Sequence, residues 1–162
     1  MTLTAFSPER LQQFTREFED LFDAADPASM TSYYTEDAKL MADGMRPIQG
    51  QAAIMDFWHA AITRAAAVGA RRAIRLHESH SSGDLGYALC AVTVRIPLAS
   101  GTTGTADTSI AVWDATIWQR DPGGSWRIAV DISTPLPRLR PERPARGKSP
   151  QAPAGLAPAP LT

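Results

Sequence analysis

The spacing of apolar residues changes once along the chain, near Gly69. Before this point, apolar residues recur every three or four positions, which is the period of an amphipathic helix. After it, they alternate with polar residues, which is the period of a strand with one buried face. Helices followed by a run of strands predict an α+β fold, in which the helices cover one face of an antiparallel sheet.

The first part of the chain contains three predicted helices and one brief strand. Ser7 and Pro8 suit the cap and the first turn of the first helix, and Gly50 precedes the last one. A segment with Gly and Pro, "DGMRP", is expected to be a loop. The predicted elements are a helix over 7–25, a shorter helix that starts at Asp26 with Tyr34 on its apolar side, a strand over 37–42, and a helix over 51–69.

Four strand candidates follow the last helix. The segments between them, "SSGD", "ASGTTG" and "RDPGGS", consist of residues that favour turns. Each turn is short enough to join neighbouring antiparallel strands. The strands are expected at residues 71–80, 85–98, 105–119 and 125–134.

The bulk composition excludes several classes of function. With 162 residues, of which 44% are hydrophobic, the chain can bury the core of one domain. A formal net charge of -1 gives no field that would attract nucleic acid or a membrane surface. Cys90 is the single cysteine, so disulfides and cysteine-based zinc sites within one chain are excluded and a reducing, cytoplasmic setting is expected.

Composition changes again after Ser133. From there to the end, the chain holds eight of its thirteen prolines, together with many Arg and Ala residues. Such a segment has little to bury and is expected to be disordered or extended. We therefore predict a domain over residues 1–135 and a Pro/Arg/Ala-rich tail over 136–162, which is either a docking arm or a solvated extension.

The order of elements and three segments carry a resemblance to a known family. "YYTEDAKL", "IQGQAAIMDFW" and "WQRDPGGSWRIAVDIS" resemble the NTF2-like superfamily, and within it the SnoaL-like and DUF4440-type proteins, which are relatives of ketosteroid isomerase. The resemblance covers residues 7–134. It implies a cone-shaped α+β barrel (NTF2-like or cystatin-like) with three helices packed on a strongly curved, mainly antiparallel sheet. It also implies an apolar cavity that opens at one end, and a homodimer formed through the sheet.

The resemblance does not fix a reaction, because a fold hosts many activities. In ketosteroid isomerase, a carboxylate base works with a tyrosine and a protonated aspartic acid. The position of the tyrosine corresponds to Phe18, which has no proton to donate. The position of the base corresponds to Ala42, or to Asp43 if the loop is shifted by one residue. The position of the aspartic acid corresponds to Asp114.

Asp114 shares one face of its predicted strand with Thr116 and Trp118. If this face lines the cavity, burial would raise the pKa of the Asp114 carboxyl group and make it a hydrogen-bond donor or general acid. If this face is instead exposed to solvent, Asp114 is an ordinary surface aspartate with no role in acid–base chemistry.

Asp131 is a second candidate for acid–base chemistry. If the "RDPGGS" turn pairs Gln119 with Trp126, Asp131 lies directly across from Asp114. Two carboxyl groups on one face would share protons and form an acid and base pair. A register shift of one residue would instead move Asp131 to the opposite face, where it would be structural.

A further set of residues is expected to form the pocket wall. His80 continues the face of Leu76 and Glu78 and either reaches the cavity mouth or lies at the surface, whereas His77 points to the other face, which argues against a shared metal site. The residues expected to bind substrate are Tyr34, Met41, Phe18, Phe57, Trp58, Thr116, Trp118 and His80.

Two functions are compatible with these residues. The first is a small cofactor-independent enzyme that uses Asp114 and Asp131, or Asp43, to isomerise, cyclise or dehydrate a hydrophobic carbonyl metabolite such as a polyketide intermediate. The second is a non-catalytic dimeric module for ligand binding or assembly. The sequence contains no HExxH motif and no nucleotide-binding glycine motif, so neither a metal nor a cofactor is expected.

Overall fold

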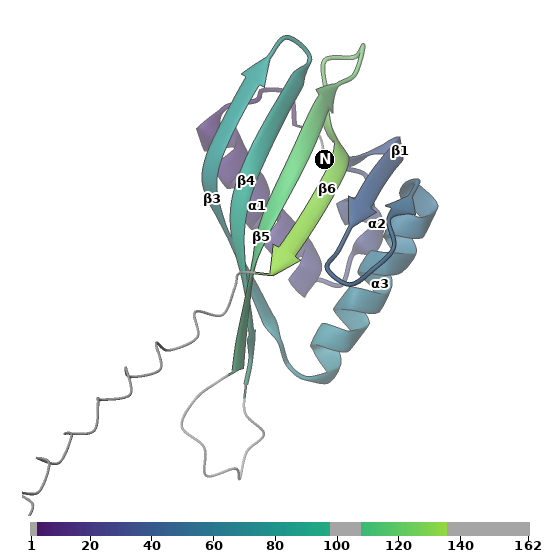
Figure 1. The fold of residues 1–162 in the computed structure, drawn as a ribbon, viewed down its shortest axis with the longest axis vertical. Coiled ribbons are helices and arrows are strands. Elements are labelled where there is room, and N and C mark those ends of the chain that lie inside the picture. The colour runs from purple at the N-terminus through teal and green to yellow at the C-terminus, as the bar shows by residue number, and fades with distance from the viewer. Residues whose placement is uncertain (1–2, 98–107, 136–162) are drawn as a thin grey trace, which may run out of the picture.

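A computed structural model of the chain describes residues 3–97 and 108–135 (Figure 1). The predicted tail over 136–162 lies outside the described residues. No helix in the described ranges has the length and the apolar character needed to cross a membrane. The elements, in chain order, are α1 (Pro8–Asp23), α2 (Pro27–Thr31), β1 (Tyr34–Met41), β2 (Ile48–Gln49), α3 (Gln51–Ala67), β3 (Arg71–Ser82), β4 (Leu85–Ile96), β5 (Thr108–Arg120) and β6 (Trp126–Pro135).

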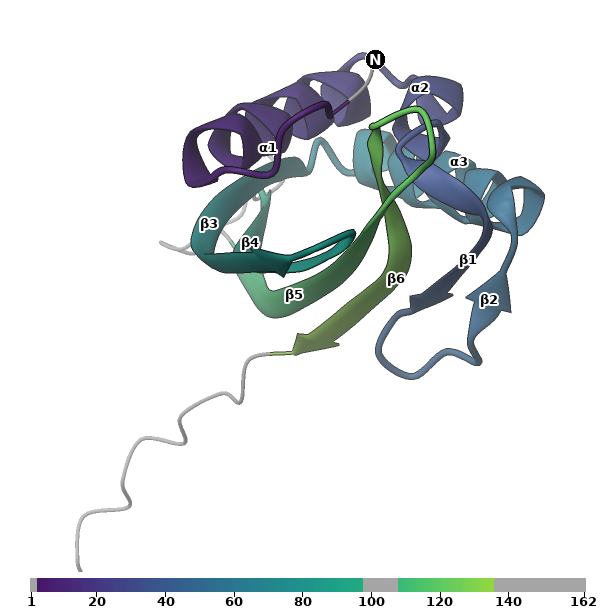
Figure 2. The same cartoon turned by 90° about the horizontal axis from the view of Figure 1, so that it is seen from above.

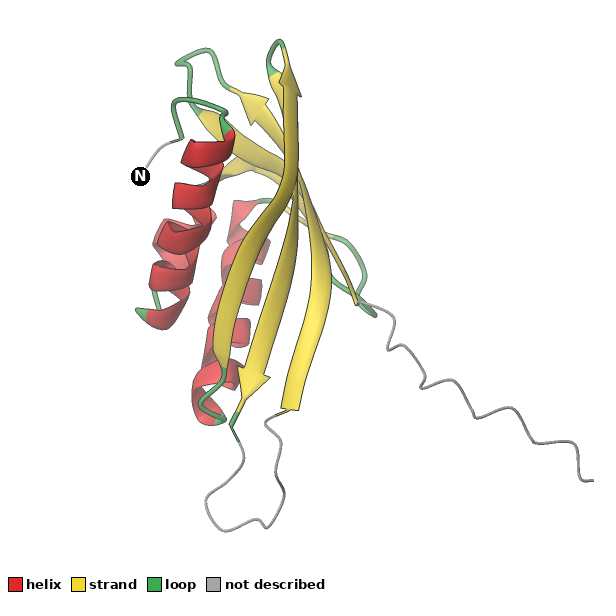
Figure 3. Cartoon of the chain, turned by 90° about the vertical axis from the view of Figure 1, so that its left-hand side faces the viewer, coloured by secondary structure: helices red, strands yellow, loops and turns green. Residues whose placement is uncertain are grey.

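The strands form one curved sheet that the helices cover on a single face. Their spatial order is β2-β1-β6-β5-β4-β3, and β1 and β6 are parallel, whereas the other neighbours are antiparallel. Figure 2 shows the sheet bending around the helices without closing, and Figure 3 shows α1 and α3 on the same side of it. The predicted α+β class, with three helices on a curved and mainly antiparallel sheet, is confirmed.

The two N-terminal helices begin where the sequence predicts. The Ser7 hydroxyl accepts a hydrogen bond from the backbone N–H of Arg10 at 3.3 Å, and Pro8 occupies the first turn of α1. The Asp26 carboxylate caps α2 in the same way, through the backbone N–H of Ser29 at 2.9 Å. The buried face of α1 packs onto β3 and into the core.

The largest local error of the sequence prediction concerns Tyr34. It was expected on the short helix, but it is the first residue of β1. The reason is a contact between distant parts of the chain, because the carbonyl of Tyr33 accepts the backbone N–H of Ile128 at 2.7 Å and draws this segment alongside β6. β2 was not predicted, since its two residues are too few to show an alternating pattern.

One end of the cone is closed by aromatic side chains. The ring of Phe6 lies 4.7 Å from that of Trp126 and 6.0 Å from that of Trp118, measured between centroids. Gly86 of β4 faces this cluster, and a Cβ atom there would lie 2.8 Å from the Phe6 ring. On the concave face of the sheet, open space therefore lies farther from this end, along the strands.

Candidate functional site

Two adjoining cavities lie between the helices and the concave face of the sheet. The inner one has a volume of ≈ 20 Å³, enough for about one water molecule. The outer one has a volume of ≈ 490 Å³, within the roughly 300–1,000 Å³ range of small-molecule sites. Arg72 and Asp131 line both cavities and mark their junction.

The inner cavity gathers polar side chains from five strands. Apart from Thr15 of α1, the rest of its wall is apolar and comes largely from α1, β3 and β4. The outer pocket is lined mostly by apolar residues of α3, β4 and β5, including Phe57, Trp58, Val92 and Val112. The polar residues of the inner cavity that the strands supply are Tyr34, Arg72, Cys90, Asp114, Thr116 and Asp131.

Asp131 is the most deeply buried carboxyl group of the site, with 5% of its surface exposed. Its Oδ2 atom accepts a hydrogen bond of 2.5 Å from the phenol of Tyr34, which is completely buried. Burial raises the pKa of Asp131 well above its ordinary value, and the nearby charge of Asp114 raises it further. The hydrogen bond from Tyr34 and the charge of Arg72 act in the opposite direction. Asp131 therefore stays protonated at pH values at which an ordinary aspartate is ionised.

Asp114 lies on the same face of the sheet as Asp131. It lines the inner cavity and accepts a hydrogen bond of 2.6 Å from the hydroxyl of Ser133. The predicted face of β5 is thus the concave one, since Thr116 and Trp118 line the same cavity. Trp118 donates its indole N–H to Thr116 at 2.8 Å, which fixes both side chains.

The predicted strand register, which placed Asp131 directly across from Asp114, is wrong. Asp114 lies opposite Ser133, and Asp131 lies opposite Thr116. One residue of the difference arises at the turn, which pairs Arg120 with Trp126, and a second arises from an irregularity between Ile117 and Trp118. Because two shifts of one residue restore the original face, both carboxyl groups still point toward the helices.

Arg72 is a functional candidate that the sequence reasoning missed. Its guanidinium lies 5.1 Å from the ring centroid of Trp58, 5.7 Å from that of Phe18 and 5.8 Å from that of Phe22. Within residues 3–97 and 108–135 it forms no ion pair, and its buried Nε atom has no hydrogen-bond partner. The sequence held one signal, because Arg72 is a charged residue on the apolar Ile74 face of β3.

Trp58 carries the other buried nitrogen without a partner in this part of the molecule. Burial and the neighbouring Asp131 raise the pKa of the Tyr34 phenol well above its ordinary value. The nearby indole N–H of Trp58 partly offsets this rise, because it stabilises the ionised phenol. The Nε1 atom makes no hydrogen bond of normal geometry with a described residue. It therefore lies close to the phenol of Tyr34 without forming a well-aligned hydrogen bond.

The remaining predicted residues divide into two groups. Phe18 lines the inner cavity, and Phe57 lines the outer one. Asp43 is exposed in the loop after β1 and lines neither cavity. Met41 also lies outside both cavities, because it follows Leu40, whose side chain faces the outer pocket.

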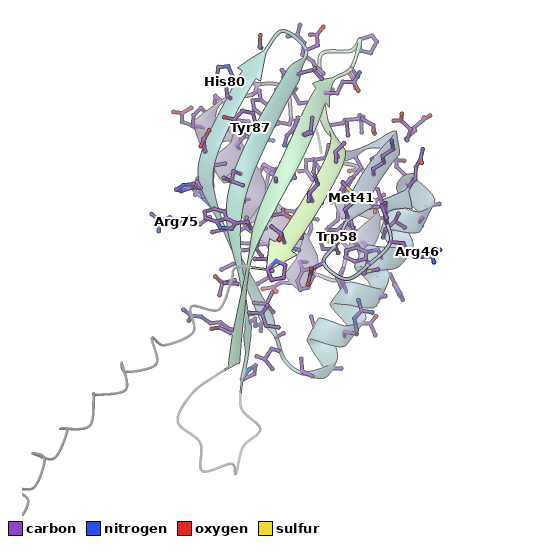
Figure 4. The ribbon with its side chains drawn as sticks, viewed as in Figure 1. Met41, Arg46, Trp58, Arg75, His80 and Tyr87 are labelled. Carbon is purple, nitrogen blue, oxygen red and sulfur yellow. The ribbon has the colours of Figure 1, made fainter. Side chains whose placement is uncertain are left out.

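His80 does not reach the cavity. The register of β3 shifts between Leu76 and Glu78, so His77 is an extra residue and the following side chains exchange faces. The His80 ring lies 6.3 Å from that of Tyr87 on the outer face of the sheet (Figure 4). His77 lies on that face as well, with its ring 5.2 Å from that of Trp113.

The described residues of the site favour neither thiol nor metal chemistry. Burial raises the pKa of the Cys90 thiol to about 12, so it stays protonated and is a poor nucleophile. Among the side chains that the structure describes, no group of three or more His, Cys, Asp or Glu could hold a metal ion. The carboxyl groups, the phenol and the guanidinium remain as the groups that could act on a ligand.

Comparisons with solved structures agree with this architecture. An NTF2-like protein with a cystatin-like fold from Novosphingobium aromaticivorans is 20% identical over 80% of this chain and 82% of that protein, with a TM-score of 0.69. A ketosteroid isomerase-like protein from Erwinia carotovora atroseptica is 19% identical over 81% and 98%, with a TM-score of 0.58.

A third similar structure is named for assembly and not for an enzymatic activity. A protein from Xanthomonas campestris, named as a calcium/calmodulin dependent protein kinase II association domain, is 13% identical over 86% of this chain and 95% of that protein, with a TM-score of 0.58. At these identities the likeness concerns the fold alone. No significantly similar sequence was found among curated proteins.

The sequence itself matches one family. The family model of the SnoaL-like domain matches residues 15–128, which include the C-terminal part of α1, the whole of α3, Tyr34, Arg72 and Asp114. The match ends before Asp131, although it covers most of the chain. The chain therefore belongs to the family of SnoaL-like domains, within the NTF2-like superfamily.

Proposed function

We propose that this protein is a cofactor-independent enzyme that transfers protons on a hydrophobic carbonyl compound. One observation carries the proposal. The buried Asp131, whose pKa is raised, lies at the junction of the small inner cavity and the large apolar outer pocket, and Tyr34 and Asp114 line the inner cavity with it. A protonated carboxyl group beside a second carboxyl group is a suitable pair for general acid–base catalysis.

In the proposed mechanism, Asp114 is the base and Asp131 is the acid. Asp114 removes a proton from the carbon next to the carbonyl group, while the proton on Oδ1 of Asp131 passes to the carbonyl oxygen. Tyr34 holds Oδ2 of Asp131 and so orients the acid. The product of this step is an enol, and the enol returns its O–H proton to Asp131 when carbon is protonated again.

The same enol leads to each of the expected reactions. If Asp114 returns its proton to a different carbon, the product is an isomer. If the enol carbon attacks a second carbonyl group, the oxygen of that group takes the proton from Asp114 and a ring forms. If a β-hydroxyl group takes this proton and leaves as water, the product is dehydrated, and in each case the enol O–H proton returns to Asp131. A polyketide intermediate contains the groups for all three. The apolar lining of the outer pocket favours such a ligand and excludes water from the developing charge.

Enolisation can be tested before the natural substrate is identified. In D₂O, the wild-type protein should accelerate exchange of the α-protons of 2-tetralone over the buffer rate, followed by NMR. Asp114→Asn should reduce this acceleration by about 100-fold or more. Asp56→Asn is the matched control, because Asp56 is exposed on α3 and lines neither cavity.

The loop residue Asp43 needs its own variant, since it is the alternative base. Asp43→Asn should exchange 2-tetralone at the wild-type rate, and a loss equal to that of Asp114→Asn would reassign the base. Native mass spectrometry of freshly purified protein, followed by extraction, should reveal a bound hydrophobic metabolite. Normal turnover by Asp114→Asn would contradict the acid–base proposal.

A non-catalytic binding or assembly module is the second candidate. Three apolar side chains are exposed on the outer face of the sheet, namely those of Leu85, Tyr87 and Ile117. They suit a homodimer formed through the sheet, and the similar structure from Xanthomonas campestris is named as an association domain. Sedimentation of wild type and Ile117→Lys tests the dimer.

A buried free thiol, Cys90, supports the proposal of a cytoplasmic location.

A further inference from the structure

Arg72 and Trp58 bring two unused hydrogen-bond donors to one place. Both side chains line the outer pocket, and Arg72 also lines the inner cavity. The Nε atom of Arg72 and the Nε1 atom of Trp58 are buried, and neither has a hydrogen-bond partner within residues 3–97 and 108–135. Of the buried side-chain nitrogen and oxygen atoms in these ranges, only these two lack a partner.

Buried donors without partners are rare in folded proteins, and they are rarest on a charged group. The neighbouring arginine shows the usual arrangement, since the Arg71 side chain is exposed to solvent and forms an ion pair of 3.2 Å with Asp23. Arg72 is instead surrounded by aromatic rings, whose faces attract the cation but supply no acceptor for its N–H groups. The rings hold the guanidinium in place and leave its hydrogen bonds available.

The carboxyl groups of the site do not satisfy Arg72. Its charge is close enough to lower the pKa of Asp131, yet it makes no ion pair with Asp131 or Asp114. Asp131 is already engaged by Tyr34, and Asp114 by Ser133. The guanidinium therefore faces a pocket of ≈ 490 Å³ with its charge uncompensated by direct contact.

We infer that Arg72 and the indole N–H of Trp58 bind a carboxylate group of the ligand at the junction of the two cavities. This inference rests on the proposed function and narrows its substrate class to hydrophobic carbonyl compounds that also carry a carboxylate. A guanidinium fork matches the two oxygens of a carboxylate, and the Trp58 indole provides a third donor. The apolar part of the ligand occupies the outer pocket.

The position of the anchor agrees with the proposed chemistry. A ligand held by its carboxylate at Arg72 lies at the junction of the two cavities, next to Asp131, which lines both of them. A second anion would be repelled by an ionised Asp131, but burial raises the pKa of this group and so favours its protonated form. The bound carboxylate thus favours the acid form that the mechanism requires.

Binding measurements on the full chain test the inference without any assay of turnover. Isothermal titration calorimetry would compare three carboxylates, 2-naphthoate, 4-phenylbutyrate and decanoate, each with its primary amide. At least one carboxylate should bind about tenfold more tightly than its amide, as expected for charge-assisted hydrogen bonds. Arg72→Gln should remove this preference, and Arg72→Lys should restore it only in part.

Arg75→Gln is the matched control, because it removes the same charge from the outer face of the same strand (Figure 4). It should keep the preference for the carboxylate. Trp58→Phe retains an aromatic face for Arg72 but removes the N–H donor, and it should weaken carboxylate binding about threefold. The Trp58→Phe variant still tests the inference if Arg72→Gln does not fold.

Two results would overturn the inference. The first is that no carboxylate binds more tightly than its amide. The second is that acetate or chloride binds as tightly as the hydrophobic carboxylates, which would make the site an adventitious anion site. The proposed reaction is judged separately, since a carboxylate preference that persists while 2-tetralone exchange is absent would remove the reaction and leave the carboxylate site.

Discussion

The phenol of Tyr34 donates a hydrogen bond of 2.5 Å to Oδ2 of Asp131, although the two residues are 97 positions apart in the chain. The contact exists because β1 and β6 run parallel side by side and bring both residues to the concave face. It joins the N-terminal strand of the sheet to its C-terminal strand at the base of the pocket. The acid of the proposed mechanism is therefore positioned by a contact between distant parts of the chain.

Tyr34→Phe should show how much the hydrogen bond to Asp131 contributes to stability and to the pKa of Asp131. Without the phenol, Oδ2 of Asp131 stays buried with one partner fewer, so the free energy of unfolding should fall by about 1–3 kcal/mol. The hydrogen bond lowers the pKa of Asp131, so its removal should raise that pKa and move the alkaline limb of 2-tetralone exchange to higher pH. Urea titration and a pH profile measure the two effects.

Tyr87→Phe is the control for the Tyr34 prediction. Tyr87 is exposed on the outer face and donates its hydroxyl to Glu78. Its loss should change the free energy of unfolding by less than about 0.5 kcal/mol and leave the pH profile unchanged. Equal effects of the two variants would mean that burial of the Tyr34–Asp131 pair contributes nothing.

Asp131→Asn should remove a pH-dependent contribution to the free energy of unfolding. The folded pKa of Asp131 lies above the unfolded value of about 3.9, so the folded state binds more protons between the two values. Wild type therefore loses stability as pH rises through this window, and the asparagine variant does not. Relative to Asp131→Asn, wild type should become less stable from about pH 4 upward, by up to about 1.4 kcal/mol per pH unit within the window.

The opposite trend is expected for an aspartate whose pKa is lowered. The Asp121 carboxylate accepts a hydrogen bond of 2.9 Å from the backbone N–H of Ser125 in the β5–β6 turn, and this bond lowers its pKa. Wild type should therefore gain stability relative to Asp121→Asn as pH rises from below about 3.9. Chemical unfolding at a series of pH values measures both differences, and the same sign for both would contradict the assignment of Asp131.

The sequence predicted the fold more fully than the site, for physical reasons. Helix caps and periodic apolar residues are local, so α1, α3 and the antiparallel strands were found near their observed positions. The start of β1 at Tyr34 depends on pairing with β6, about a hundred residues away, and no local pattern encodes it. Two residues of β2 are too few to form a pattern at all.

The sequence pattern assigned some site residues to the wrong face or partner of the sheet because the strands contain irregularities. One shift between Leu76 and Glu78 was enough to turn His80 to the outer face. Two shifts between β5 and β6 left Asp131 on the concave face but opposite Thr116 instead of Asp114. Face assignments from alternation thus hold only up to the first irregularity. Arg72 was overlooked although the alternation of β3 already placed it among apolar residues.

Gly86→Ala should destabilise the closed end of the cone. The added Cβ would lie 2.8 Å from two atoms of the Phe6 ring and 3.2 Å from the carbonyl of His80. Overpacking of this kind typically costs about 1–3 kcal/mol, measurable as a lower free energy of unfolding. In the background of Phe6→Ala the same change should cost less, and equal costs in both backgrounds would show that the ring is not the obstacle.

Arg72→Met separates stability from binding at the pocket. The guanidinium forms no ion pair among the described residues, so the fold loses only its contacts with the aromatic rings and no longer has to hold a partly buried charge. Cation–π contacts are worth about 0.5–2 kcal/mol, and relief of the buried charge offsets them. The free energy of unfolding should therefore stay within about 1 kcal/mol of wild type, or rise, while carboxylate binding is lost. A fall of more than about 3 kcal/mol, of the size caused by breaking a buried ion pair, would mean that Arg72 serves the fold instead of a ligand.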